Sequence, residues 1–172
     1  MFFRRLGKMG GSDSSARKLH ASATAQSRRP EFYRILGAPD TVDGRFELLT
    51  LHVVMLLERL KEQPAVRQDL FDTYVSDLDG ALREMGVGDL SMGRRMKQLG
   101  QVFYGRAAAF DAAFRSLPDD TELREVIART IFQNTANGDP GGLVAYAIDC
   151  RAALVACATE GLLAGEIAWG RL

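Results

Sequence analysis

The sequence predicts an all-α protein, a single-domain bundle of about six helices with a mobile basic N-terminal arm. Three observations lead to this prediction. Apolar residues recur at steps of three and four from residue 45 onward, and no segment alternates apolar and polar residues between turn signals. The 172 residues can bury one good core but are rather few for two. With 47% hydrophobic and 26% charged residues, the composition is that of an ordinary globular chain.

The predicted arm covers residues 1–18, and the helical domain covers residues 19–172. Basic residues dominate the chain before residue 40, where the acids are Asp13 and Glu31. A first helix is expected over Leu19 to Arg29, because Pro30 interrupts it. The start turns charged and Gly-rich too early for a secretion signal, whereas its Arg- and Ser-rich composition leaves a mitochondrial transit peptide open.

The remaining helices follow from periodicity and turn residues. A helix over about residues 45–62 is apolar on nearly every face, which predicts a central position in the core. The next begins at Pro64 and has an acidic outer face. A long amphipathic helix of about 25 residues follows residue 88, a shorter one follows Asp120, and an Ala-rich helix runs over about residues 143–163. The longest nearly apolar run, Leu48 to Leu57, is about half of the roughly 20 residues that cross a bilayer.

Patterns of catalysis and metal binding are missing from the sequence. Zinc-ligand spacings, a P-loop and a nucleophile elbow are all absent, so we expect no catalytic residues, no metal and no cofactor. His52 lies in the most apolar helix and is interpreted as a hydrogen-bonded core histidine. Cys150 and Cys157 are seven residues apart on one predicted helix, roughly 10 Å, which is too far for a disulfide and predicts free thiols.

The segment "GDLSMGRRMKQLGQVFYGR" (88–106) combines basic, Met and aromatic residues on one predicted helix. A solvated outer face, a polyanion site and a protein-binding face all fit this pattern. The zero formal net charge and the acidic preceding helix argue against a polyanion site. Met, aromatic and Arg side chains are enriched at protein interfaces, so a protein-binding face is the favoured interpretation.

Two segments carry a resemblance to a known family. "EFYRILGAPDTVDGRFELLTLHVVMLLERL" (31–60) and "MGVGDLSMGRRMKQLGQVFYGR" (85–106) resemble the ubiquinol-cytochrome c chaperone family, which contains a mitochondrial assembly factor for cytochrome b and its bacterial relatives. The likeness spans roughly residues 19–165. It implies an all-helical, non-enzymatic chaperone that binds newly made cytochrome b and promotes its assembly into ubiquinol-cytochrome c reductase, respiratory complex III.

The resemblance and the side-chain chemistry together predict a client-binding set. It consists of the members of the second motif whose side chains can be exposed: Arg94, Arg95, Lys97, Gln98, Tyr104 and Arg106. A membrane-surface set is also predicted, because apolar residues stand beside basic ones at the start of the arm: Phe2, Phe3, Arg4 and Arg5.

The resemblance favours a bacterial-type member, placed in the cytoplasm at the inner face of the inner membrane, without a specific nucleic-acid partner. Peripheral contact with that membrane and proximity to the ribosome stay open. Two other hypotheses compete with the chaperone. One is a haem or small-ligand protein with His52 as a ligand, and the other is ribosome or nucleic-acid binding through the basic arm and helix.

Overall fold

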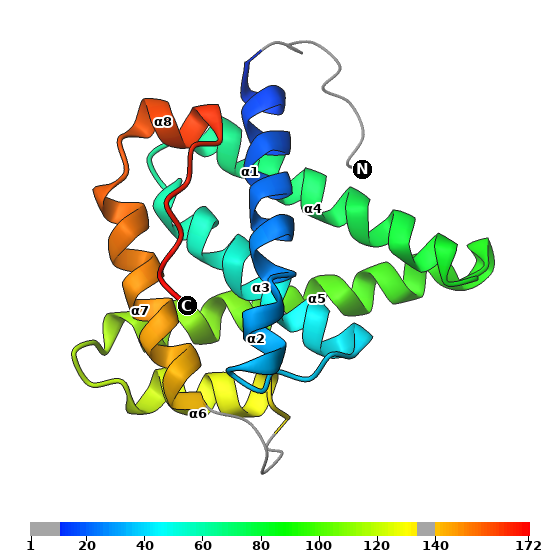
Figure 1. The fold of residues 1–172 in the computed structure, drawn as a ribbon. Helices are drawn as coiled ribbons and strands as arrows, with labels where there is room; N and C mark the ends of the chain where they lie inside the picture. The colour runs from blue at the N-terminus through cyan, green and yellow to red at the C-terminus, as the bar shows by residue number, and fades with distance from the viewer. Residues whose placement is uncertain (1–10, 134–139) are drawn as a thin grey trace.

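The protein is an all-α bundle, as predicted. In the computed structural model, which describes residues 11–133 and 140–172, every regular element is a helix. Figure 1 shows them packed around α3, with α4 and α5 forming an antiparallel hairpin that extends to one side. The helices are α1 (Ser12–Ser27), α2 (Pro30–Arg34), α3 (Val42–Arg59), α4 (Pro64–Glu84), α5 (Asp89–Arg115), α6 (Thr121–Thr130), α7 (Pro140–Ala156) and α8 (Thr159–Ala164).

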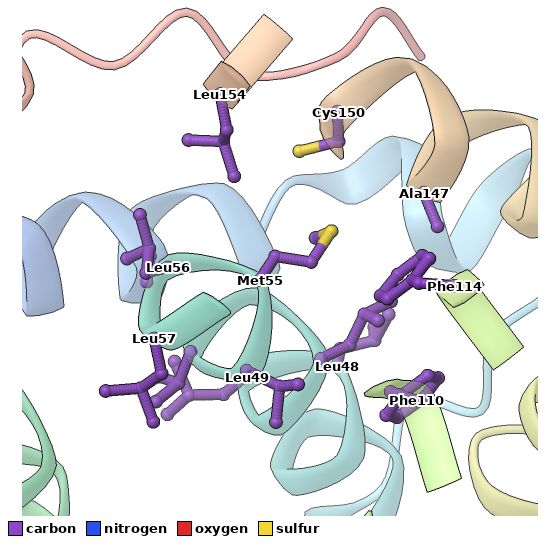
Figure 2. Packing of buried hydrophobic residues seen from close by; sticks show 14 of the residues in the cluster. Leu48, Leu49, Met55, Leu56, Leu57, Phe110, Phe114, Ala147, Cys150 and Leu154 are labelled. Atoms are coloured by element: carbon purple, nitrogen blue, oxygen red, sulfur yellow. The ribbon is translucent and has the colours of Figure 1, made fainter. Parts of the chain in front are cut away.

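Helix α3 is the centre of the core, which confirms the expectation from its apolar faces. It packs against α1, α4, α5 and α7, and its side chains from Leu48 to Leu57 are buried. Figure 2 shows Met55 of this helix lying near Cys150 of α7, with Phe110 and Phe114 of α5 beside Leu48. A helix surrounded by partners has no solvent-facing side, so its sequence lacks a polar stripe.

The start of α3 is fixed by a tight turn. Thr41 is the N-cap, and its hydroxyl oxygen accepts a hydrogen bond from the Gly44 amide at 3.1 Å. Gly44 is packed so closely that a Cβ atom there would lie 2.0 Å from the Pro39 carbonyl oxygen. The loop before α3 therefore requires glycine at this position for space.

The helices differ from the sequence-based expectation in several places: α2 was not predicted, and α3 and α7 each begin about three residues earlier than expected. Helix α1 begins at Ser12 instead of Leu19, so residues 12–18, which were assigned to the arm, are helical and bury Ala16. The Ala-rich segment is two helices, because α7 ends at Ala156 and α8 begins at Thr159. Arg59 of α3 stabilises the chain at this break, because its guanidinium donates to the carbonyl oxygens of Leu154 and Cys157 at 2.8 and 2.9 Å.

A buried polar network joins α1, α3 and α7 around His52. The Leu48 carbonyl accepts a hydrogen bond from His52 Nδ1 at 2.7 Å, so Nε2 is the acceptor for the Tyr146 hydroxyl at 2.8 Å. Gln26 Nε2 in turn donates to the Tyr146 oxygen at 3.0 Å. Burial lowers the pKa of His52 from 6.5 to about 4, so the ring is neutral at physiological pH.

The C-terminal segment after α8 runs back along the bundle, near α1 and α7 (Figure 1). The Trp169 indole donates to the Ser22 hydroxyl of α1 at 3.0 Å, and its ring meets the His52 ring edge-on at 5.1 Å. Gly170 lies so close to α7 that a Cβ atom there would be 2.7 Å from the Cys150 amide nitrogen. The segment is thus part of the domain core.

Candidate protein-binding groove

A hollow of about 760 Å³ lies between the first part of α3, the second half of α4 and the first half of α5. Its surface is mostly apolar, and its lining comes mainly from α3, α4 and α5, with Ser27, Arg28 and Gln133 from other parts of the chain. The apolar lining residues are Val42, Phe46, Leu49, Leu78, Ala81, Leu82, Met85, Val87, Leu99 and Val102. We call this hollow the α3–α5 groove.

Three of these side chains expose a large fraction of their surface: Val42 63%, Met85 61% and Val102 37%. Single exposed apolar residues are ordinary, but here they share one concave surface with half-buried Phe46. A concave apolar surface of this kind fits an apolar segment of another molecule, because covering it removes the exposed side chains from water.

Charged residues stand around the groove. Arg45 is paired with Asp40 at 2.7 Å on the outside. Arg95 is exposed, lines the groove, and has no ion-pair partner among the side chains that the structure describes. An acidic group on a bound segment would find its counter-charge at Arg95. The geometry suits an apolar segment that also carries a carboxylate.

A buried ion pair supports the base of the groove. The Arg106 guanidinium donates to both carboxylate oxygens of Glu47, over distances of 2.8 to 3.1 Å. The Glu47 side chain is 8% exposed and that of Arg106 is 29% exposed. Arg106 thus ties α5 to α3, and its guanidinium already satisfies a carboxylate of its own chain.

The six predicted client-binding residues fall on two sides of α5. Arg95, Gln98 and Arg106 line the groove. Arg94, Lys97 and Tyr104 are exposed outside its lining, and Lys97 is about 200° from Arg95 around the helix. A partner that fills the groove would therefore touch the first three.

Tyr104 belongs to an aromatic cluster at the surface. It is 62% exposed, and its ring centroid lies 5.7 Å from that of Phe71 on α4. Phe71 also stacks near buried Phe103 at 5.2 Å. Tyr104 therefore packs at the contact between α4 and α5 while most of its side chain stays exposed.

Sequence reasoning missed the apolar part of the groove and the partner of Arg106. Val42, Phe46 and Met85 line the groove, and none of them was among the predicted client-binding residues. One signal for the ion pair was present, because Arg106 occupies a position where the α5 stripe calls for an apolar residue. Glu47, in an otherwise apolar segment, is the matching irregularity in α3.

Further predictions concern the membrane-surface residues, the two cysteines and metal binding. The membrane-surface residues Phe2, Phe3, Arg4 and Arg5 are outside the described residues. Both thiols are free; Cys150 is buried, Cys157 is partly exposed, and burial raises the pKa of Cys150. Among the described residues, no group of three or more His, Cys, Asp or Glu side chains could hold a metal ion.

The ring of His52 is closed to an external ligand in this structure. The side chain is fully buried, and the Tyr146 hydroxyl uses the lone pair of Nε2. The core-histidine interpretation is the one that these contacts support. None of the helices that the structure describes is both long and apolar enough to cross a membrane.

Comparison with known proteins places this fold in a family. The family model described as "Ubiquinol-cytochrome C chaperone" matches residues 34–169, which include the three helices that form the groove. A search of curated proteins finds no match. Among solved structures, the crystal structure of the Cbp3 homolog from Brucella abortus is similar, with a TM-score of 0.83 and 32% sequence identity. That likeness covers 94% of this chain and 91% of the Brucella chain. The chain therefore belongs to the ubiquinol-cytochrome C chaperone family.

Proposed function

We propose that the protein is a non-catalytic assembly chaperone that holds newly made cytochrome b in the α3–α5 groove and promotes its entry into ubiquinol-cytochrome c reductase. The family gives the chaperone role and a client related to that complex. The observation that carries the choice of site is the concave apolar surface itself, with Val42, Met85 and Val102 exposed on three different helices.

The chemistry of the groove matches an integral membrane protein as client. The segments of such a protein that enter a bilayer are long and predominantly apolar, and they need a covered surface while they wait outside it. The groove offers apolar contact along α4 and α5, together with the exposed cations Arg28 and Arg95 for a polar group on the client. Its volume of about 760 Å³ is small against a whole helix, so the groove would hold one face of a segment.

The chaperone role needs no bond making or breaking by the protein. The groove is lined by apolar residues, arginines, the amide residues Gln98 and Gln133, and three acids, Asp43, Glu47 and Asp77, of which Glu47 is paired with Arg106. A holding site works by covering surface and releasing it later, which requires moderate affinity. The predicted location at the membrane follows from the client and belongs to this proposal.

The test is recovery of cytochrome b with the tagged full-length protein from membranes in mild detergent. The groove variant Val102→Asp places a charge on the apolar surface of the groove, and Arg95→Glu reverses the charge at the exposed residue 95. Val155→Asp is the matched control, because Val155 is 67% exposed on α7, outside the groove lining. A fourth variant reverses three predicted client-binding cations, Arg94, Arg95 and Lys97, to Glu.

We expect recovery of cytochrome b with the wild type and the Val155→Asp control, and a loss of roughly tenfold with Val102→Asp. Equal recovery with all variants would move the client elsewhere on the surface. If the wild type recovers no cytochrome b, and a deletion strain keeps normal cytochrome b levels, the chaperone proposal fails. Thermal unfolding of each variant separates loss of binding from loss of fold.

A further inference from the structure

The turn between α4 and α5 carries two exposed apolar side chains, of which Met85 lines the end of the groove and Leu90 lies outside its lining. The hairpin projects from the bundle, with the turn at its far end (Figure 1). Leu90, in the first turn of α5, is 106% exposed, and Met85 at the end of α4 is 61% exposed. Gly86 has a φ of +83°, a conformation that favours glycine and lets the chain reverse in a few residues. The two apolar side chains therefore sit at a narrow, protruding tip.

Basic side chains lie directly behind this tip. Arg94 and Lys97 follow Leu90 by four and seven residues, roughly 6 and 10 Å along the helix axis. Both are exposed, and neither has an ion-pair partner among the described side chains. Residues 83–97 contain two acids, Glu84 and Asp89, against the cations Arg83, Arg94, Arg95 and Lys97. Of these cations, Arg83 forms an ion pair with Asp79 at 2.8 Å.

We propose that the α4–α5 tip docks on an anionic lipid bilayer, with Leu90 and Met85 in the interfacial region and Arg94 and Lys97 at the level of the lipid phosphates. Interfacial binding buries apolar side chains about 5–10 Å into the boundary between headgroups and acyl chains. The axial spacing of Leu90, Arg94 and Lys97 matches that depth, because long cationic side chains reach back to phosphate while their stems stay in the interface.

Membrane contact is favoured over a second protein by the shape and the charge of the tip. Two apolar side chains on a thin projection bury little area against a flat protein surface, whereas stable interfaces bury about 800 Å² per partner. An anionic surface complements both cations at once, and each contributes an attraction of its own near that surface. Membrane docking by the tip does not require a client, so it can be tested independently of the proposed function.

The tip and the groove are continuous, which gives membrane contact a consequence. Met85 and Val87 line the end of the α3–α5 groove at the turn. A tip seated in the bilayer would open the groove toward the membrane surface. This consequence rests on the proposed function, because it applies to a client that leaves or enters the bilayer there.

The experiment uses full-length protein and vesicles of phosphatidylcholine with or without phosphatidylglycerol. In flotation, we expect the wild type to bind the phosphatidylglycerol vesicles, Leu90→Asp to bind roughly tenfold more weakly, and the Arg94→Gln, Lys97→Gln double variant to lose about as much. Val155→Asp is the matched control and should bind like the wild type, since Val155 is also an exposed apolar residue but lies on α7.

A direct readout comes from tryptophan placed at the tip. Leu90→Trp should show a blue-shifted emission and quenching by brominated lipid when phosphatidylglycerol vesicles are added, and Val155→Trp should show neither. Unchanged flotation of Leu90→Asp, as expected if the bilayer were held by Phe2 and Phe3 alone, would overturn the inference. So would a wild-type dimer that Leu90→Asp dissociates without any binding to vesicles, because the tip would then be a contact between copies.

Discussion

Arg106 forms an ion pair with Glu47, so replacing this predicted client-binding residue should change the stability of the fold. Replacing Arg106 with Met removes three hydrogen bonds and leaves the Glu47 carboxylate, 8% exposed, without its counter-charge. Methionine keeps an apolar stem of similar length, so packing changes little. We therefore expect Arg106→Met to act mainly on the free energy of unfolding, and on client binding only through it.

The size of the loss follows from the burial of the two partners. Removing one member of a buried ion pair costs about 3–5 kcal/mol. Arg106 is 29% exposed, so water reaches part of the site and we expect a loss of about 2–3 kcal/mol. In the double variant Glu47→Leu, Arg106→Met no charge stays buried. This variant should be more stable than Arg106→Met alone by at least about 1 kcal/mol.

Equilibrium urea denaturation of the wild type, both single variants and the double variant gives the four free energies of the cycle. A large positive coupling energy supports the pair as described. If Arg106→Met changes the free energy of unfolding by less than about 0.5 kcal/mol, or if the two single changes simply add, the ion pair does not stabilise the contact between α3 and α5. Under conditions in which the Arg106→Met variant is folded, we expect it to recover cytochrome b about as well as the wild type does.

Three further predictions follow from the core. His52 has a pKa of about 4 in the folded protein against 6.5 in the unfolded chain, so between these pH values the unfolded chain binds a proton that the folded protein does not. The free energy of unfolding should therefore fall as the pH drops from 6.5 to 4, by up to about 3 kcal/mol. His52→Gln should lack this part of the pH dependence when unfolding is measured over the same pH range. Gly44→Ala should destabilise the domain by about 2 kcal/mol or more in thermal unfolding, because its Cβ would overlap the Pro39 carbonyl. A thiol reagent should modify Cys157 in the folded protein and Cys150 after unfolding, which peptide mapping would show.

Each of these has a control within the chain. Gly93→Ala, in α5 with open space around its Cβ position, should be neutral or stabilising by up to about 1 kcal/mol. A Gly44→Ala protein as stable as Gly93→Ala would contradict the close approach. A His52→Gln protein with the same acid dependence as wild type would assign that dependence to other groups. Equal labelling rates for the two thiols would contradict the burial of Cys150.

The helices were predictable because their periodicity and capping residues are local. Pro64 and the glycines at 86 and 88 bound α4 as expected, and α3 is central because its sequence has no polar face. The break between α7 and α8 was not predictable in the same way. Arg59 holds that turn from another helix, 95 and 98 residues away from the carbonyls it contacts.

The groove was only partly predictable for a similar reason. A helical wheel can place Arg95 and Gln98 on α5, but it does not show which neighbouring helix leaves a hollow beside them. Arg106 was predicted as a client-binding residue, and its ion-pair partner Glu47 is 59 residues away. The family resemblance directed attention to α5, while the fold brings α3 and α4 to the same surface.

The measurement that tests the central claim most directly is photo-crosslinking in living cells with a photoreactive amino acid at Val102. Val102 lies in the groove, and Ala108 is an exposed position on another side of the same helix, so it serves as the control. A client held in the groove predicts a covalent adduct with cytochrome b from position 102 and little or none from position 108. Adducts with cytochrome b from neither position, or equally from both, would contradict the assignment of the groove as the client-binding site.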